Sequence, residues 1–313
     1  MISFGPIPSR RLGKSLGINN ITSQKTCSFS CIYCQIGLTK NVCITRKQFY
    51  EPIKIYEEIC MHLEKLKVAD MPDYLTFVAN GEPTLDINLG KSIEKLKQLN
   101  IPIAVITNGS LLNEQHVRDD LNLADWVSVK VDSNEEVVWK TINRPMYTLV
   151  FEKYIDDMLL FSSKFKGILA TETMLIEGVN DSNELLYKTS SLIQKINPSV
   201  SYISIPTRPP ALSLVKAPEE SIINNAYQIF SDRKLNVELL LSFEGTNTGY
   251  TGNAVEDILN ICTVHPIRED TMLELLSKDN ADIHVVELLI RDKQIKKVNY
   301  KTSNFYIRQF QIR

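Results

Sequence analysis

Between residues 50 and 242 the chain alternates helical stretches, whose apolar positions recur about every 3.6 residues, with short β-rich apolar runs. Gly, Pro and Asn separate the two kinds of segment, as expected for turns. We predict strands at Ser15–Ile21, Tyr74–Ala79, Ala104–Thr107, Trp126–Val131, Ile168–Leu175 and Tyr202–Ile205. We predict helices at Ile53–Leu66, Asn88–Gln98, Glu114–Leu121, Val150–Phe161, Asn183–Ile196 and Glu219–Phe230.

This repetition predicts an α/β fold. Strands that alternate with helices are joined by right-handed crossovers and lie parallel to one another. Six such units form a partial (βα)6 barrel, because this region is too short for a closed barrel of eight units.

The pattern changes after a turn-rich segment, Asn247–Asn253. Three short helices and two β-prone runs follow, at Ala254–Cys262, Arg268–Ser277, Ala281–Ile290, Gln294–Val298 and Phe305–Phe310. Three helices and a hairpin are the order of a winged helix, a variant of the helix-turn-helix. We therefore expect two domains, a barrel at residues 1–246 and a small winged-helix domain at residues 254–313.

Composition places the protein in a reducing, aqueous compartment. Apolar residues make up 43% of the chain, and six cysteines are too few for a disulfide scaffold. The apolar runs are short, such as Val285–Ile290, whereas a membrane span needs about 18 residues. No apolar stretch that would suit a secretory signal follows Arg10 and Arg11. We expect a cytoplasmic protein with no membrane partner; the sequence does not indicate its oligomeric state.

Charge is distributed unevenly, although the net charge is only −2. Residues 1–50 contain seven Lys or Arg and no Asp or Glu, and residues 281–313 contain seven basic and three acidic residues. Basic segments of this kind attract polyanions such as RNA, or they are simply solvated surface.

The strongest chemical signal is a group of three cysteines, Cys27, Cys31 and Cys34. Thiolates at this spacing in a loop can hold one iron–sulfur cluster, and three ligands on four irons leave one iron open for a reactant. The alternative, a zinc site, needs a fourth ligand close by. The nearest candidates, Cys43 and His62, are distant in the sequence.

With Tyr33 directly before the third cysteine, the motif resembles the signature of the radical S-adenosylmethionine (SAM) superfamily. The resemblance implies a [4Fe-4S] cluster whose open iron is chelated by SAM, reductive cleavage of SAM to a 5′-deoxyadenosyl radical, and an electron donor such as flavodoxin or ferredoxin. The catalytic residues are unknown at this point.

The same resemblance implies SAM contacts at the carboxyl ends of the strands, where parallel barrels build their sites. Glu82 would hold the SAM amino group, Lys130 the methionyl carboxylate and Asp132 the ribose hydroxyls. The full set of cofactor contacts is Tyr33, Asn80, Gly81, Glu82, Pro83, Thr107, Asn108, Lys130, Asp132 and Glu172. Ordinary strand-end roles for Lys130, Asp132 and Glu172 stay open.

Four segments resemble the branch that includes the tRNA wybutosine-synthesis (4-demethylwyosine synthase-like) enzymes: Phe4–Asn19, Tyr33–Gln35, Ile142–Pro145 and Pro206–Pro210. They supply candidate anion contacts at Arg10, Arg11, Arg144 and Arg208, each of which could equally form a structural ion pair. Residues 1–26 contain no cysteine, so the second cluster of the wybutosine enzyme, and its substrate, do not carry over.

The sequence of the C-terminal segment is compatible with more than one class of substrate. Its basic residues Arg291, Lys293, Lys296, Lys297 and Lys301 suit tRNA or another RNA. A winged helix can also bind a peptide by strand addition, or serve only in folding or dimerisation. A redox-sensing regulator that binds nucleic acid is a further alternative. We expect residues 254–313 to recruit the substrate and to take no part in SAM cleavage.

Overall fold

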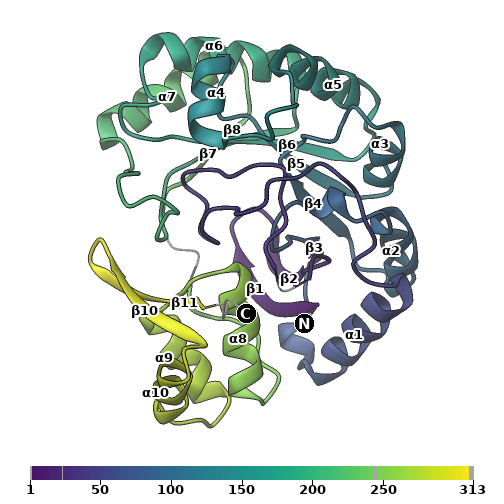
Figure 1. Ribbon diagram of the computed structural model, residues 1–313, viewed down its shortest axis with the longest axis vertical. Coiled ribbons are helices and arrows are strands. Elements are labelled where there is room, and N and C mark those ends of the chain that lie inside the picture. Colours follow the sequence, from purple (N-terminus) through teal and green to yellow (C-terminus); the bar gives the residue numbers. More distant parts are fainter. Residues whose placement is uncertain (1, 23, 243–244, 310–313) are drawn as a thin grey trace.

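The computed structural model describes residues 2–22, 24–242 and 245–309. One curled sheet forms the body, with its eight strands in chain order (Figure 1). The strands are β1 (Ser3–Ser9), β2 (Gly13–Ile18), β3 (Tyr74–Phe77), β4 (Ile103–Thr107), β5 (Trp126–Lys130), β6 (Ile168–Met174), β7 (Val200–Ser204) and β8 (Val237–Leu240). Strand β1 is antiparallel to β2, and all later neighbours are parallel. In the described residues β1 and β8 are the two edges, so the barrel is open.

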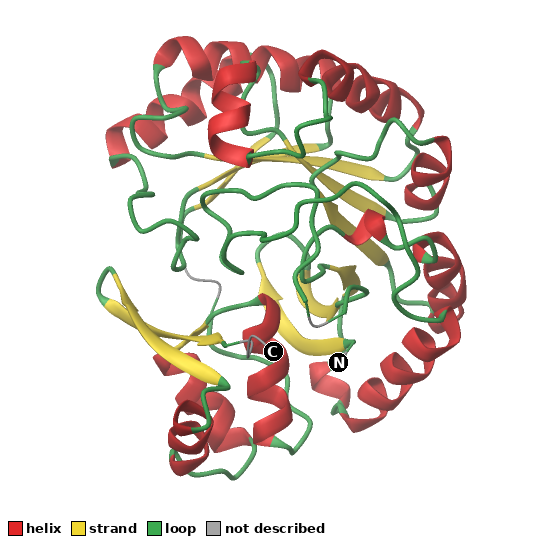
Figure 2. Cartoon of the chain, viewed as in Figure 1, coloured by secondary structure: helices red, strands yellow, loops and turns green. Residues whose placement is uncertain are grey.

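Seven helices cover the convex side of this sheet, as Figure 2 shows in red against the yellow strands. They are α1 (Pro52–Lys65), α2 (Leu89–Leu96), α3 (Gln115–Leu121), α4 (Glu136–Asn143), α5 (Phe151–Lys164), α6 (Asn183–Ile196) and α7 (Glu220–Asp232). The predicted α/β class and the open barrel are thus confirmed.

The predicted number of strands was wrong, because the sheet has eight strands and not six. Strand β1 carries Pro6 and Pro8, which argue against a strand in a sequence but are tolerated at a sheet edge. Strand β8 is only four residues long and partly exposed. Helix α4 was also missed; it is short, and the β-branched Val137 and Val138 lower its helix propensity.

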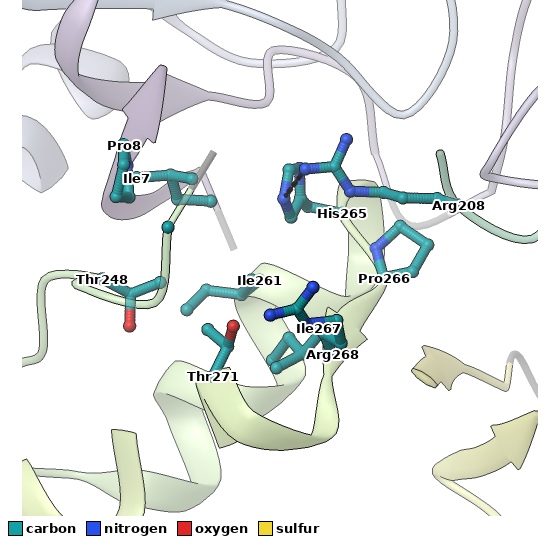
Figure 3. Close-up of a pocket in the computed structure, with 11 residues that line it drawn as sticks. Ile7, Pro8, Arg208, Thr248, Ile261, His265, Pro266, Ile267, Arg268 and Thr271 are labelled. Carbon is teal, nitrogen blue, oxygen red and sulfur yellow. Dashed lines mark hydrogen bonds between the residues drawn. The ribbon is translucent and has the colours of Figure 1, made fainter. Parts of the chain in front are cut away.

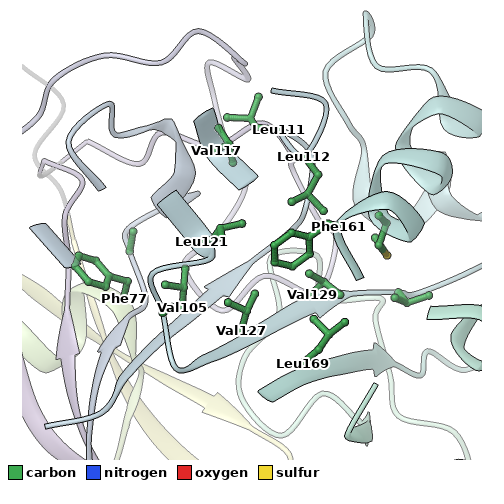
Figure 4. Packing of buried hydrophobic residues seen from close by; sticks show 14 of the residues in the cluster. Phe77, Val105, Leu111, Leu112, Val117, Leu121, Val127, Val129, Phe161 and Leu169 are labelled. Atoms are coloured by element: carbon green, nitrogen blue, oxygen red, sulfur yellow. The ribbon is translucent and has the colours of Figure 1, made fainter. Parts of the chain in front are cut away.

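The main core lies between the sheet and the helices (Figure 4). β-Branched residues such as Val105 and Val127 face Leu121 of α3, and Phe161 of α5 packs in the same layer. Trp139 of α4 extends this packing to the cysteine loop, since its ring lies 5.8 Å from that of Phe29 in an edge-to-face arrangement. The core therefore holds the loop that carries the cysteines.

The C-terminal segment contains every element predicted for it. Helices α8 (Ala254–Val264), α9 (Glu269–Lys278) and α10 (His284–Arg291) precede the hairpin of β10 (Ile295–Tyr300) and β11 (Ser303–Arg308). A short strand, β9 (Ile267–Arg268), completes an antiparallel sheet in the order β10-β11-β9. The two-domain division and the winged-helix assignment remain predictions.

This segment is docked on the first strand of the barrel. Phe4 and Ile7 of β1 belong to the same buried apolar cluster as Ile258 and Ile261 of α8. The backbone N–H of Gly249 donates to the carbonyl of Pro6 at 2.6 Å. Among the described residues no helix combines the length and the apolar character that crossing a membrane would require.

Candidate metal and cofactor site

The cysteine loop crosses the carboxyl ends of the strands and is held there by backbone hydrogen bonds. Thr26 donates to the carbonyl of Asn80 at 3.1 Å and accepts from the N–H of Glu82 at 3.0 Å. On the other side of the loop, the N–H of Ser30 donates to the carbonyl of Asn143 at 3.0 Å. Two segments that the sequence marked as motifs, after β3 and at the end of α4, therefore clamp the loop.

Gly81 makes the first of these clamps possible. A Cβ atom on Gly81 would lie 1.6 Å from the carbonyl oxygen of Thr26, and its φ of +142° suits glycine. The glycine of the motif is thus required by the close approach of two backbones.

Each cysteine sulfur of the loop has an N–H donor nearby. The Nδ2 of Asn108 lies 3.6 Å from the Sγ of Cys27, and the Nδ2 of Asn143 lies 3.5 Å from the Sγ of Cys31. The Nζ of Lys25 lies 3.2 Å from the Sγ of Cys34. Donors around sulfur stabilise thiolate ligands and tune the potential of an iron–sulfur cluster. This donor set fits a cluster bound by three thiolates.

Burial opposes thiolate formation in the metal-free protein. It raises the pKa of Cys27 and raises that of Cys31 to about 12. Only a bound cation would keep both sulfurs deprotonated near neutral pH. No three His, Cys, Asp or Glu side chains within residues 2–22, 24–242 and 245–309 converge on one metal ion.

Glu82 lies in the loop after β3, and its hydrogen bonds connect this loop to the end of β4. Its carboxylate accepts hydrogen bonds from the hydroxyls of Thr84 and Thr107, at 2.7 and 2.6 Å, and from the backbone N–H of Asn108 at 2.8 Å. Burial raises the pKa of Glu82, although these bonds act in the opposite direction. In the structure Glu82 therefore organises the layer beneath the cysteine loop, and its predicted contact with the SAM amino group stays a prediction.

Asp132 occupies a similar position after β5. It accepts from the hydroxyl of Tyr33 at 2.6 Å, from the Nδ2 of Asn143 at 2.7 Å and from the backbone N–H of Met174 at 2.8 Å. Burial is the largest influence on the pKa of Asp132 and raises it. The same Asn143 amide thus connects this carboxylate to Cys31.

A cavity of about 310 Å³ opens beside the loop inside the curled sheet. This volume is at the lower end of the range for ligand pockets. Cys34 and Tyr33 of the loop line the cavity, and so does Gly81. Each of the eight strands also contributes to its wall, for example through Phe4, Gly17, Thr76, Ile106, Lys130, Glu172, Ser204 and Leu240.

An ion-paired cluster lies in this cavity. Glu172 accepts from the Nζ of Lys130 at 2.7 Å and from the guanidinium of Arg11, and the hydroxyl of Ser204 lies 3.0 Å away. Burial would raise the pKa of Glu172, but the two cations outweigh it and lower the pKa to about 2. Glu172 is therefore a carboxylate at any physiological pH.

The predicted cofactor contacts separate into two layers. Tyr33, Gly81, Lys130 and Glu172 line the cavity, whereas a second group is buried beneath the cysteine loop outside the described lining: Asn80, Glu82, Pro83, Thr107, Asn108 and Asp132. Of the candidate arginines, Arg11 and Arg208 line the cavity. Arg10 bonds to Ser242 and to the carbonyl of Leu239, and Arg144 ends α4.

Three residues of the candidate site were not predicted from the sequence. Lys25 and Asn143 approach the cysteine sulfurs, and His265 lines the cavity from the C-terminal segment. Asn143 stood inside a motif that the sequence marked. Lys25 lies two residues before Cys27, so its position beside the cysteine motif was the available signal. His265 carries no local signal, because only the tertiary fold brings it to the site, where its Nε2 lies 2.8 Å from the Nη2 of Arg208 (Figure 3).

Comparison with known proteins agrees with this geometry. The family model described as "Radical SAM superfamily" matches residues 21–189, which contain the cysteine loop and strands β3 to β6. The chain is 42% identical over 314 residues to UPF0026 protein MJ1312 of Methanocaldococcus jannaschii, covering 100% of this chain and 97% of that protein.

Solved structures share the fold. A structure of TYW1 with a lysine-pyruvate adduct bound superposes with a TM-score of 0.53 and 18% identity, covering 71% of this chain and 75% of that one. A radical SAM methyltransferase from Sphaerobacter thermophilus gives a TM-score of 0.51 and 16% identity, covering 72% and 66% of the two chains. The cysteine loop, the open barrel and the family match together show that the chain belongs to the radical SAM superfamily.

Proposed function

We propose that this enzyme uses a [4Fe-4S] cluster on Cys27, Cys31 and Cys34 to cleave SAM reductively and to modify an RNA, with tRNA as the first candidate. The observation that carries the proposal is the position of Cys34, which lines a cavity whose other walls carry cationic side chains. When bound, the cluster and SAM supply the electron and the 5′-deoxyadenosyl radical. A small reductant protein such as flavodoxin or ferredoxin would deliver the electron.

The chain's own residues would bind and orient the cluster and SAM and shield them from solvent. Asn108, Asn143 and Lys25 direct N–H groups at the sulfurs, and the strands enclose the cavity on several sides. Lys130 and Arg11 hold Glu172 ionised in a fixed position, so the cavity offers an oriented carboxylate beside two cations. A site with opposite charges at fixed positions suits the amino and carboxylate groups of SAM.

An RNA substrate is supported by the surface of the C-terminal segment. Lys293, Lys296 and Lys301 are exposed between the end of α10 and the tip of the β10–β11 hairpin. Lys297 belongs to the same surface but pairs with Glu269 at 2.5 Å. Exposed cations on a helix end and a hairpin are the arrangement by which winged helices bind phosphates.

Anaerobic turnover tests the proposal. Cluster-loaded enzyme is incubated with SAM and dithionite, with or without a tRNA pool from cells that lack the protein, and 5′-deoxyadenosine and modified nucleosides are measured. We expect tRNA to increase 5′-deoxyadenosine formation and a new nucleoside to appear. The variant Lys293→Gln/Lys296→Gln should weaken tRNA binding and reduce its salt dependence. No stimulation and no new nucleoside would reject an RNA substrate.

One observation favours a second candidate, a peptide substrate. Strand β10 is the outer strand of the β10-β11-β9 sheet in the described structure, so one of its edges is open to strand addition. The two candidates differ in what disrupts binding. Asn299→Pro would block backbone pairing with a peptide, because the N–H of Asn299 points away from β11 in this register, whereas Lys296→Gln would affect mainly RNA.

A further inference from the structure

Asn143 is the last residue of α4 and lies directly against the cysteine loop. The backbone N–H of Ser30 donates to the carbonyl of Asn143 at 3.0 Å, and the N–H of Ile32 donates to the carbonyl of Ile142 at 2.9 Å. Ser30 and Ile32 are the two neighbours of Cys31 in the sequence. The end of α4 is therefore bonded to the loop on both sides of Cys31, which holds the Asn143 side chain in place beside this cysteine.

The side-chain amide of Asn143 is oriented by Asp132. Its Nδ2 lies 2.7 Å from the Oδ2 of Asp132 and 3.5 Å from the Sγ of Cys31. Because a carboxylate oxygen accepts hydrogen bonds, the nitrogen of the amide and not its oxygen faces this side. An NH2 group has two protons, so one serves Asp132 while the other is directed at the sulfur.

The position of the Asp132 carboxylate is fixed in turn. The hydroxyl of Tyr33 donates to Oδ2 at 2.6 Å, and the backbone N–H of Met174 donates to Oδ1 at 2.8 Å. Asp132 and Asn143 are each only 2% exposed, so water screens their interactions little. The NH2 group of Asn143 thus bridges a buried carboxylate and a thiolate, whose negative charges would otherwise repel one another.

A donor at a cluster ligand acts unequally on the two oxidation states of the cluster. Reduction adds one negative charge, and the positive end of an N–H dipole stabilises the more negative state to a greater extent. An N–H group that is held at Cys31 therefore favours the reduced cluster.

We propose that Asn143, oriented by Asp132, is a positioning residue that raises the reduction potential of the cluster through its hydrogen bond to Cys31. The inference rests on the proposed function, because it requires the cluster. Under that function the cluster is reduced before SAM is cleaved, so Asn143 lowers the demand on the electron donor. Asp132 thereby gains a function that does not require contact with SAM.

The test is a redox titration of full-length, cluster-loaded enzyme without SAM, followed by electron paramagnetic resonance. Asn143→Leu has a similar shape but no donor. We expect the reduction equilibrium to shift about three- to tenfold towards the oxidised cluster, as the loss of one charge-assisted hydrogen bond allows. For a one-electron couple this lowers the midpoint potential by about 30–60 mV.

Asn143→Asp is the second variant. It keeps the size and polarity of the side chain and can share a proton with Asp132, but it offers no N–H to the sulfur. Its midpoint potential should fall at least as far as that of Asn143→Leu. A role confined to holding α4 against the loop would not lower the potential in both variants.

Asn20→Leu is the matched control. Asn20 is also buried and also donates to a carboxylate, that of Asp86, at 3.2 Å. This change should reduce stability and leave the midpoint potential unchanged. Iron content and thermal unfolding are measured for every variant, and Asn143→Ser replaces Asn143→Leu if the latter does not load iron.

Lower potentials in both Asn143 variants, with no change in Asn20→Leu, would support the inference. Equal potentials in the wild type and both variants would overturn it and leave the proposed function intact. A higher potential in Asn143→Leu would overturn it too, because the amide would then not favour the reduced cluster. A wild-type protein that binds no iron would reject the proposed function itself, and the inference with it.

Discussion

The carboxylate of Glu82, in the loop after β3, accepts a hydrogen bond of 2.8 Å from the backbone N–H of Asn108, the residue after β4. In Glu82→Gln an amide NH2 placed at this oxygen would face the N–H of Asn108, so one buried donor would lose its partner. We expect the free energy of unfolding to fall by about 1–3 kcal/mol. Urea denaturation measures this, and the exposed Glu177→Gln is the control.

The same variant separates the structural role of Glu82 from its predicted contact with SAM. If the carboxylate holds the SAM amino group, SAM affinity falls while iron content is unchanged. If it only supports the cysteine loop, iron content falls together with SAM affinity. Unchanged stability and unchanged SAM binding would contradict both roles.

Cys31→Ala should abolish the cluster, because two thiolates do not hold four irons. Reconstituted wild-type protein should contain about four irons per chain and show a paramagnetic signal on reduction that SAM alters. Cys60→Ala is the control: Cys60 lies on α1, so this change should cost on the order of 1 kcal/mol and leave iron binding intact. Stoichiometric zinc without iron in the wild-type protein would refute the assignment.

Gly81→Ala should prevent the cysteine loop from closing on the end of β3, because the new Cβ would overlap the carbonyl oxygen of Thr26. We expect iron content to drop to a small fraction of the wild-type value while far-UV circular dichroism stays near normal. The matched control is Gly178→Ala, where φ is also positive (+68°) but nothing lies within 4 Å of the added Cβ. That change should cost only about 1–2 kcal/mol and retain the cluster. Normal iron content in Gly81→Ala would show that the loop tolerates a different path.

Glu172 should contribute stability that depends on pH. Its folded-state pKa of about 2 lies below the ordinary value of 4.5, so the contribution is complete above pH 4.5 and is lost as pH falls towards 2. At pH 7 we expect Glu172→Gln to lose on the order of 2–3 kcal/mol, because Lys130 and Arg11 lose their common partner. The difference between wild type and variant should shrink at pH 3, as measured by urea denaturation. A difference that is constant from pH 7 to pH 3 would contradict the ion-paired cluster.

Elements with a strong local pattern, such as a helix cap or an apolar stripe, were predicted well from the sequence. The helix at Asn183–Ile196 was predicted with its observed bounds, because Ser182 caps its start and an apolar stripe runs along its length. The prolines of β1 and the shortness of β8 hid both edge strands, since such strands form through pairing with a neighbour more than through local preference.

The candidate site was predictable as a set of residues but not as an arrangement. The cysteine spacing and the strand-end positions indicated which side chains gather at one end of the barrel. Spacing does not show that Glu82 and Asp132 face into a buried hydrogen-bond layer while Glu172 faces the cavity. The pairing of Arg208 with His265 joins residues 57 positions apart, which no local pattern records.

The docking of α8 against β1 has a consequence for the order in which the protein is made. The apolar partners of Phe4 and Ile7, Ile258 and Ile261, are synthesised more than 240 residues later than these two side chains. At about 5–20 residues per second, this delay lasts on the order of ten seconds to a minute. During that time the edge of the nascent sheet exposes apolar side chains and unpaired backbone groups, which a chaperone would bind. The apolar side chains of the sheet edge therefore stay uncovered until α8 has been synthesised, and their burial coincides with the arrival of His265 at the cavity.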